Sequence, residues 1–448
     1  MPAIVLPDSG FYQTVMDDPF GLNVILHDSV YPATNRFFTH LEIEWCFKTL
    51  PFCFQKLSTP VKSIYYSCAL VKTGVQFFLI FLMAFVITGS RKFFGFDFLF
   101  VGVLLIPFFQ TFGFNQWMGI IDHSITYTFF YALSLGLVMA FFLPFFYNWF
   151  HKGSLKINYL TFILLICLLV IISFNGPLNP PLILLIGLTI IFNFFSGIFF
   201  SFNAISIFEK IKISLKSIPL NLFLLIFLAC LMSGYSFYIG LNNSENLWEK
   251  ISLGERYSRL PSGLWNQYLS VPGPVLLITI LILNVFIIYF LKDDLKKKKI
   301  FFLLKWFAIL CLIYILLLPL GGYRSYRPDI IRRDTILPVT LGLLFFYGLT
   351  AFYIIKTVSV KYKKPYYSLI FIVGLIFFVH DFELRKYNLC ERNAFEKISQ
   401  SPDRVVFLDN DCSVMNWGKT LDTANSENKT KVLLYWGVIK EKKLYYQK

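Results

Sequence analysis

Long runs without Asp, Glu, Lys, Arg or His constrain this chain more than any other feature of its sequence. The longest run, 157–208, has 52 residues. A helix that crosses the ~30 Å hydrocarbon layer of a bilayer needs about 20 apolar residues. This run therefore holds two crossings, which the turn-forming residues of 175–181 separate. The other runs are 73–90, 98–121, 124–150, 217–244, 260–291, 306–323, 335–355 and 365–379.

Together these runs predict an all-α integral membrane protein with about ten transmembrane helices. The composition agrees, because the mean hydropathy is +0.63 and only 15% of residues are charged. A soluble domain averages about 25% charged residues, so a soluble globular protein is excluded. We expect an extracytoplasmic loop with interfacial helices at 1–70, a transmembrane domain at 71–380 and a small extracytoplasmic C-terminal domain at 381–448.

Lysine and arginine alternate between the loops and predict the orientation of the chain. The loops after the odd-numbered spans carry sixteen of these residues and the loops after the even-numbered spans carry seven. Cytoplasmic loops are enriched in Lys and Arg. The odd loops are therefore predicted to be cytoplasmic, which places both terminal segments outside a cell's inner (plasma) membrane.

The external N-terminal segment leaves a question of topology. Residues 1–3 (Met-Pro-Ala) do not begin a signal peptide, which has a basic region and an apolar core of 7–15 residues. Either the positive charge of the first cytoplasmic loop exports the segment, or a first helix precedes Met1. The second interpretation, which we favour, gives eleven helices.

The charged residues and cysteines also exclude several functions. The net charge of +15 does not indicate a nucleic-acid partner, because the basic residues form short clusters beside apolar runs. The eight cysteines include no CxxC pair and no histidine at zinc spacing, so we expect no metal and no cofactor. Asp97 and Lys305 lie near span ends. The absence of mid-span Asp, Glu, Arg and His argues against an ion pump or a proton-coupled transporter.

The fourth external loop, 321–334, is the strongest candidate for a binding site. It has no lysine, and its Gly321-Gly322 pair lets the backbone approach a ligand. The guanidinium group offers a planar fork of donors suited to phosphate. The alternative is a structural loop whose arginines pair with Asp329, Asp334 and lipid headgroups. The predicted substrate-binding residues here are Tyr323, Arg324, Arg327, Arg332 and Arg333.

Two other external loops carry weaker signals. In the third loop, Arg256 and Arg259 lie among aromatic residues and carboxylates, which suits either a sugar or lipid-phosphate contact or an interfacial helix. In the first, Asp122 and His123 suit an acid/base pair, although a solvated turn is the simpler interpretation.

The N-terminal segment is rich in acids that suit a general base. Asp8, Asp17 and Asp18 are the candidates for taking a proton from an acceptor hydroxyl. Asp17 and Asp18 also suit the N-terminus of a helix, because Pro19 follows them. The segment 35–57 has an apolar face at helical spacing and is predicted to be an interfacial helix.

This layout resembles the GT-C superfamily of polyprenyl-phosphate-sugar glycosyltransferases. The resemblance comprises the multi-span architecture, the acids Asp8, Asp17 and Asp18, the run 35–38 (Asn-Arg-Phe-Phe) and the arginine-rich loop 321–334. It implies a catalytic acid in the first external loop and a lipid phosphate held by basic residues, among which we include Arg36. The implied partners are the bilayer, a polyprenyl-phosphate-linked sugar and a lipid-linked or cell-surface glycan acceptor. The missing first helix departs from the family pattern and leaves the choice of acid open.

Two other functions remain as alternatives. An O-antigen-type polymerase or ligase would use external arginine and histidine to hold lipid pyrophosphates. A lipid-linked-sugar flippase or a structural subunit would not be an enzyme, and a flippase would need a polar path across these nearly uncharged spans.

The C-terminal tail has features of a small folded unit. We expect strands at 404–408 and 432–436. Cys390 and Cys412 are either bridged or free on the predicted external side, where a disulfide persists.

Overall fold

The computed structural model is mostly helical. It describes residues 13–109, 118–153, 157–199, 206–246, 251–321, 328–380, 387–416 and 418–448. In these residues eight helices are long and apolar enough to cross a membrane, which confirms a multi-span membrane protein. They are α4 (Pro60–Thr88), the continuous helix Ile125–Lys152 that contains α6, η4, α7 and η5, Asn179–Gly197 within α9 (Asn179–Phe199), α11 (Leu220–Gly240), α13 (Pro272–Phe290), α14 with η8 (Leu295–Leu320), α15 (Leu337–Thr357) and α16 (Val360–His380).

Two shorter apolar helices occupy the remaining two predicted spans. One is α5 (Phe96–Leu105) with its extension η2 (Ile106–Phe109), and the other is α8 (Tyr159–Ser173). At about 1.5 Å per residue each covers about 20 Å, less than the hydrocarbon thickness. Each of the ten predicted spans therefore corresponds to an apolar helix, although only eight have the full length.

The helix ends differ from the ends of the charge-free runs. The run 73–90 belongs to α4, which already begins at Pro60, because the Thr59 hydroxyl accepts a hydrogen bond from the Lys62 amide and proline suits the first helical turn. The run 260–291 covers parts of three elements: α12 (Leu253–Leu264), η7 (Trp265–Leu269) and α13. Helix ends depend on capping residues, so they do not coincide with the charged residues that bound the apolar runs.

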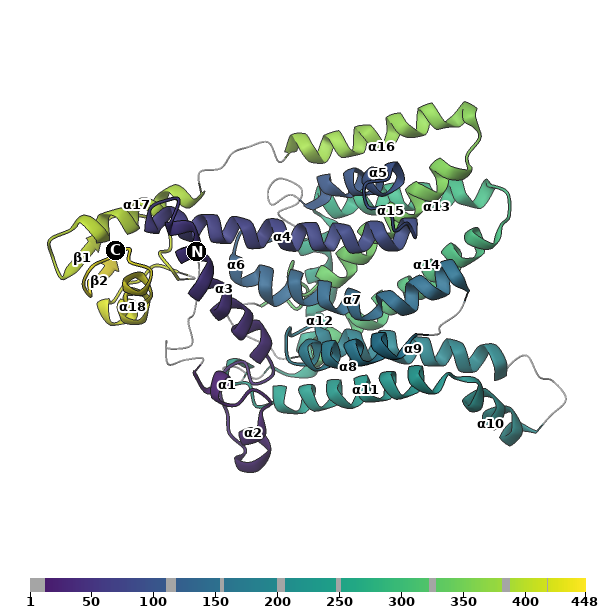
Figure 1. The fold of residues 1–448 in the computed structure, drawn as a ribbon, viewed down its shortest axis with the longest axis horizontal. Coiled ribbons are helices and arrows are strands. Elements are labelled where there is room, and N and C mark those ends of the chain that lie inside the picture. The colour runs from purple at the N-terminus through teal and green to yellow at the C-terminus, as the bar shows by residue number, and fades with distance from the viewer. Residues whose placement is uncertain are drawn as a thin grey trace.

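The helices cross the bundle side by side (Figure 1). At one end lie three helices of the N-terminal region and the C-terminal unit, and we call this the domain end. The helix α10 (Ile207–Ser217) projects from the opposite end, which we call the loop end. The N-terminal helices are α1 (Gln13–Asp17), α2 (Leu22–His27) and α3 (Phe37–Gln55).

The helix α15 forms the centre of the bundle. In the most apolar 18-residue stretch of α15, 78% is buried inside the protein, whereas the corresponding share for α14 is 11%. Leu344, Tyr347 and Ile354 are fully buried, and α15 packs against α13, α4 and α5. The weakly buried α14 presents most of its apolar surface outward, as expected of a helix that faces lipid.

The C-terminal unit combines helices with a two-stranded parallel sheet. Its elements are α17 (Tyr387–Gln400), β1 (Val405–Leu408), α18 (Glu427–Tyr435) and β2 (Leu444–Gln447). The first predicted strand is confirmed as β1. The second is wrong, because 432–436 lies in α18 and the turn after it. Val432, Leu433 and Trp436 are buried at helical spacing, and parallel strands need a crossover, which α18 supplies.

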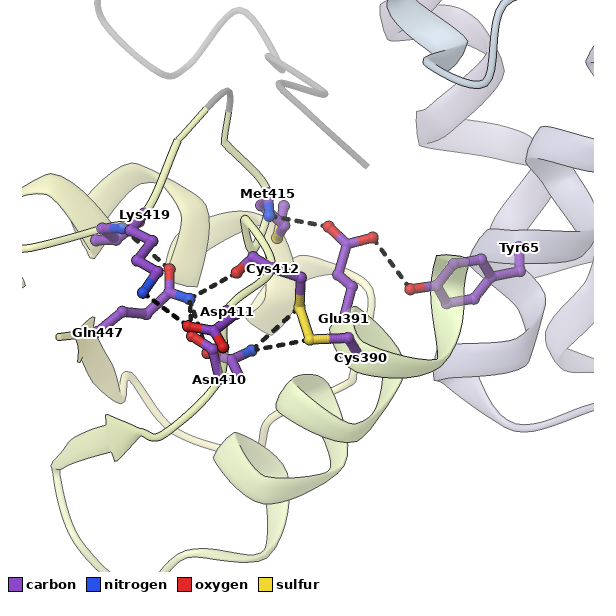
Figure 2. The surroundings of a disulfide bond; sticks show 10 residues. Tyr65, Cys390, Glu391, Asn410, Asp411, Cys412, Met415, Lys419 and Gln447 are labelled. Atoms are coloured by element: carbon purple, nitrogen blue, oxygen red, sulfur yellow. Dashed lines mark hydrogen bonds and ion pairs between the residues drawn. A yellow bond between two sulfur atoms is a disulfide. The ribbon is translucent and has the colours of Figure 1, made fainter. Parts of the chain in front are cut away.

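A disulfide joins Cys390 and Cys412 in this unit, so the bridged alternative holds. Figure 2 shows Glu391 beside the bridge, pointing toward Tyr65 of α4. The Glu391 carboxylate accepts hydrogen bonds from the Tyr65 hydroxyl at 3.2 Å and from the Met415 amide at 2.9 Å. The buried carboxylate therefore ties the C-terminal unit to a membrane-spanning helix.

The C-terminal unit also docks on α3. Trp436 is fully buried, and its indole Nε1 donates to the Phe47 carbonyl at 2.9 Å. The Gln55 side-chain amide donates in return to the Trp436 carbonyl at 2.7 Å. Side chains of the unit share one apolar core with α3, α4 and α6 (Ile125–Tyr127). The interfacial helix predicted at 35–57 is thus a helix, and the C-terminal unit covers part of it.

We expect Trp436→Phe to weaken this docking. It keeps an aromatic ring but leaves the buried Phe47 carbonyl without its donor, which lowers the free energy of unfolding by about 1–3 kcal/mol. Thermal unfolding in detergent measures the change. The control is Tyr435→Phe, since the partly exposed Tyr435 hydroxyl lies 3.4 Å from the Lys48 carbonyl and its loss should change stability by less than about 0.5 kcal/mol. Equal effects of the two variants would contradict this role of the indole.

Candidate functional site

The residues predicted to form the site divide into two groups. Seven of them lie on elements at the domain end: Asp17, Asp18, Arg36, Arg256, Arg259, Arg332 and Arg333. The other four lie outside the described residues: Asp8, Tyr323, Arg324 and Arg327.

Asp18 has a structural environment. It is buried, and its Oδ1 accepts from the Leu22 amide at 2.7 Å. Its Oδ2 accepts from the Asn23 amide and the Tyr31 hydroxyl, each at 2.9 Å. Both oxygens are thus engaged in holding the start of α2, in keeping with the helix-capping interpretation. Asp17 lies on the exposed side of α1 and accepts from the Gln13 side chain at 2.9 Å.

Arg332 binds within its own loop. Its Nε and Nη2 donate to the two carboxylate oxygens of Asp334 at 3.0 and 3.2 Å, and Nη1 donates to the Asp329 carbonyl at 3.2 Å. The Tyr131 hydroxyl donates to the same Asp334 carboxylate at 3.0 Å. This is the pairing that the structural alternative for the loop expects, and it fixes the loop to η4 (Thr128–Leu133), a π-helical turn of the span 125–152.

Arg333 reaches a different loop and forms an ion pair with Asp122. Asp122 is only 4% exposed, and its Oδ1 accepts from the Ser124 amide at 2.7 Å. Gly119 makes room for the arginine: its φ is +60°, and a Cβ there would lie 2.2 Å from Arg333 Cγ. No local sequence pattern indicates this pair, because its members are separated by 211 residues.

His123 lies beside this ion pair. Its Nδ1 is 3.5 Å from Asp122 Oδ1, and its carbonyl accepts from Lys72 Nζ at 2.5 Å. Burial lowers the pKa of His123, and the positive charges of Arg333 and Lys72 lower it further, against the opposing effect of Asp122. These effects favour the neutral form of the His123 imidazole.

Arg256 and Arg259 brace the arginine-rich loop on both sides. Both lie on α12, which the Ser252 hydroxyl caps. Arg256 Nη1 donates to the Gly321 carbonyl at 2.9 Å, and Arg259 Nη1 donates to the Pro328 carbonyl at 3.2 Å. The segment 322–327, which the structure does not describe, therefore begins and ends at points held by α12.

Arg36 directly precedes α3. Its Cζ lies 5.8 Å from the centroid of the Phe130 ring, and its Nη1 lies 3.4 Å from Glu245 Oε2. His40 contacts the same ring edge-to-face, with the centroids 5.2 Å apart. Burial, and after it the Arg36 charge, lowers the pKa of His40 to about 3, so this histidine is neutral at physiological pH. Phe130 and Tyr131 of η4 thus separate the Arg36 group from the Arg332 group.

Glu42 is a residue that sequence reasoning missed as a site candidate. Its Oε1 accepts from the Asn175 side-chain amide at 2.8 Å, whereas Oε2 is buried and has no hydrogen-bond partner among the described residues. Burial raises the pKa of Glu42 to about 7, although the Asn175 hydrogen bond opposes this shift. A carboxyl group in this state exchanges its proton near neutral pH.

The signal for Glu42 was present in the predicted interfacial helix. Thr39, Glu42 and Cys46 follow one another at the i, i+3, i+7 spacing of a single helical face. The Thr39 hydroxyl hydrogen-bonds to Asn175, so this face meets the turn between α8 and α9. A carboxylate on the buried face of a predicted helix is therefore the sequence pattern that indicates such a residue.

The domain end therefore brings together guanidinium groups, buried carboxylates and neutral histidines from loops that are distant in sequence. The described residues contain no group of three or more His, Cys, Asp or Glu side chains that could hold a metal ion. Such an arrangement can hold an anion and move a proton. Comparison with protein families, curated proteins and solved structures finds no match to this chain.

The raised pKa of Glu42 predicts a pH-dependent stability. The folded state favours the protonated acid, so the protein loses stability as pH rises from the ordinary pKa of 4.5 toward about 7. Glu42→Gln removes this titration, and above pH 7 the variant should be more stable than the parent by up to about 3 kcal/mol. Thermal unfolding from pH 5 to 8 measures the difference.

The control is Glu44→Gln on the same helix, where Glu44 forms an ion pair with Lys48. This variant should keep the parent's pH profile between pH 5 and 8. If Glu42→Gln and the parent lose stability in parallel across this range, the carboxyl does not titrate there.

Proposed function

We propose that this chain is a membrane glycosyltransferase of the GT-C type. It moves a sugar from a polyprenyl-phosphate donor to a lipid-linked or cell-surface glycan acceptor on the extracytoplasmic face. The observation that carries the proposal is the convergence, at one end of the bundle, of two external loops in which Arg256 and Arg259 hold the ends of the arginine-rich segment.

The loop charges support an extracytoplasmic site. The loops between spans carry seven Lys and Arg residues at the domain end and sixteen at the loop end, which favours a domain end that faces outward. The Cys390–Cys412 disulfide supports this orientation, because disulfides persist in oxidising compartments.

The donor phosphate would bind at the arginine-rich loop. Arg332 and Arg333 are engaged with Asp334 and Asp122, and these ion pairs hold the C-terminal side of the loop in place. Tyr323, Arg324 and Arg327 lie between the two braced points of the loop. We therefore assign direct phosphate contact to these three residues, and the positioning of the loop to Arg256, Arg259, Arg332 and Arg333. Arg36, on the far side of Phe130, would contact the acceptor.

The base would be an acid of the N-terminal segment. It takes the proton of the acceptor hydroxyl while that oxygen bonds to the anomeric carbon and the bond to the donor phosphate breaks. Developing charge on the departing phosphate is stabilised by the arginines. Because Asp18 is engaged at α2, Asp8 and the exposed Asp17 are the stronger candidates.

The main alternative is an O-antigen-type polymerase or ligase. The observation that favours it is His123 beside the Arg333–Asp122 pair, since such an enzyme would use arginine and histidine and would not need a separate acid. A flippase would need a polar path through the spans.

The transfer of labelled sugar in proteoliposomes tests the proposal. Asp8→Asn or Asp17→Asn should reduce turnover by about 10²–10⁴-fold with donor binding retained. Arg324→Lys or Arg327→Lys should instead weaken donor binding, because lysine keeps the charge but loses the fork. Arg91→Lys, in the first loop of the opposite face, is the matched control and should change neither quantity.

Three results would contradict parts of this proposal. Full transfer by the combined Asp8, Asp17 and Asp18 variant would refute the carboxylate base. Loss of transfer in His123→Gln, with those acids dispensable, would support the polymerase. Absence of transfer from every polyprenyl-linked donor, by a correctly folded protein, would overturn the enzyme proposal.

A further inference from the structure

The helix α10 lies far from the candidate site at the domain end. It stands at the loop end of the bundle, between α9 and α11, and projects beyond the other helices in Figure 1. The Ser206 hydroxyl accepts from the Glu209 amide at 3.3 Å and begins the helix. Neither the membrane crossing nor the proposed sugar transfer requires a helix at this place.

The apolar side chains of α10 are exposed. Ile207 is 66% exposed and Phe208 85%, and Ile211 lies on the same side of the helix at 37%. Among the α10 side chains that the structure describes, only that of Ser214 is buried. The helix therefore contacts α9 through a narrow strip and leaves its apolar stripe uncovered by the protein.

The rest of the helix is basic. Lys210, Lys212 and Lys216 accompany a single acid, Glu209. At 100° per residue, Lys212 lies next to Phe208 at one edge of the apolar stripe and Lys210 lies toward the other edge, whereas Lys216 and Glu209 lie farther round the helix. An exposed apolar stripe flanked by lysines is typical of helices that lie in the plane of a membrane interface.

The position of α10 places this stripe at the level of the membrane. Only two residues separate its last residue, Ser217, from Leu220, where the span α11 begins. The three steps from Ser217 to Leu220 span at most about 11 Å, so the end of α10 stays close to the membrane surface. Leu220 and Leu224, in the first turns of α11, are 67% and 44% exposed, so the span that follows α10 presents apolar side chains outward.

We propose that α10 is an interfacial lipid-binding helix that lies on the leaflet at the loop end and is held there by anionic lipids. Ile207, Phe208 and Ile211 insert between the upper parts of the acyl chains. Lys212 and Lys216 bind phosphate groups of the headgroups. The occupant is anionic lipid and not a protein partner, because α10 leads within a few residues into a membrane span and its charged side chains have a net positive charge.

The depth of a spin label tests this inference in the full-length protein. The label is placed at Phe208→Cys or Glu209→Cys, in a chain that lacks its six free cysteines and keeps the Cys390–Cys412 bridge. The protein is reconstituted in vesicles of phosphatidylcholine with or without phosphatidylglycerol. With phosphatidylglycerol, the label at 208 should lie about 5–10 Å below the phosphate level, protected from a water-soluble nickel complex and accessible to oxygen. The label at 209 should remain accessible to nickel.

The lysines should account for the lipid dependence. Changing Lys210, Lys212 and Lys216 together to Gln should move the label at 208 outward in phosphatidylglycerol vesicles, to the depth that it has in phosphatidylcholine alone. The matched control changes Lys361, Lys363 and Lys364 to Gln, which removes the same charge at another loop of this end, and it should leave the depth unchanged.

Two results would overturn the proposal. One is equal access of nickel to labels at 208 and 209 in anionic vesicles. The other is a label at 208 that is exposed in pure lipid but protected in native membranes, which would mean that a protein covers α10.

Discussion

The exclusion of charge from hydrocarbon governs the whole structure. A polar group left unpaired in lipid costs several kcal/mol, so the spans are almost purely apolar helices and the charged chemistry moves to the two ends of the bundle. At both ends some of these charges form ion pairs: Arg333 binds the buried Asp122, and Lys356 pairs with Asp97 at 2.7 Å. The two ends of the bundle consequently differ in their loops and charged residues. The domain end has folded loops and buried acids, and the loop end has short lysine-rich connections.

At the domain end, arginine acts mainly as a structural brace. Arg256 and Arg259 donate to backbone carbonyls, and Arg332 is bidentate to Asp334. Such contacts hold the backbone at Gly321 and Pro328. The docking of the C-terminal unit on α3 and α4 through Trp436 and Glu391 adds rigidity at the same end. In the proposed function, neighbouring arginines divide binding and bracing between them.

The sequence predicted what depends on local pattern. The ten apolar helices, the helix at 35–57 and the strand β1 follow from periodicity and charge. The second strand was misassigned, because a short apolar run such as 432–436 fits a strand and a helix equally well. The pairing of Arg333 with Asp122, and the environments of Asp18 and Glu42, depend on elements that meet only in three dimensions. A single sequence has no local signal for such contacts, whereas the helix face of Thr39 and Glu42 shows where one was available.

Sidedness is tested most directly by thiol labelling of intact cells with a membrane-impermeant reagent. Asp403→Cys in the C-terminal unit and Lys296→Cys at the start of α14 are exposed positions at opposite ends of the bundle. Both are introduced into a chain that lacks its free cysteines and keeps the disulfide. We predict that position 403 is labelled in intact cells and that position 296 is labelled only after permeabilisation. Labelling of 296 in intact cells, with 403 protected, would contradict an extracytoplasmic site.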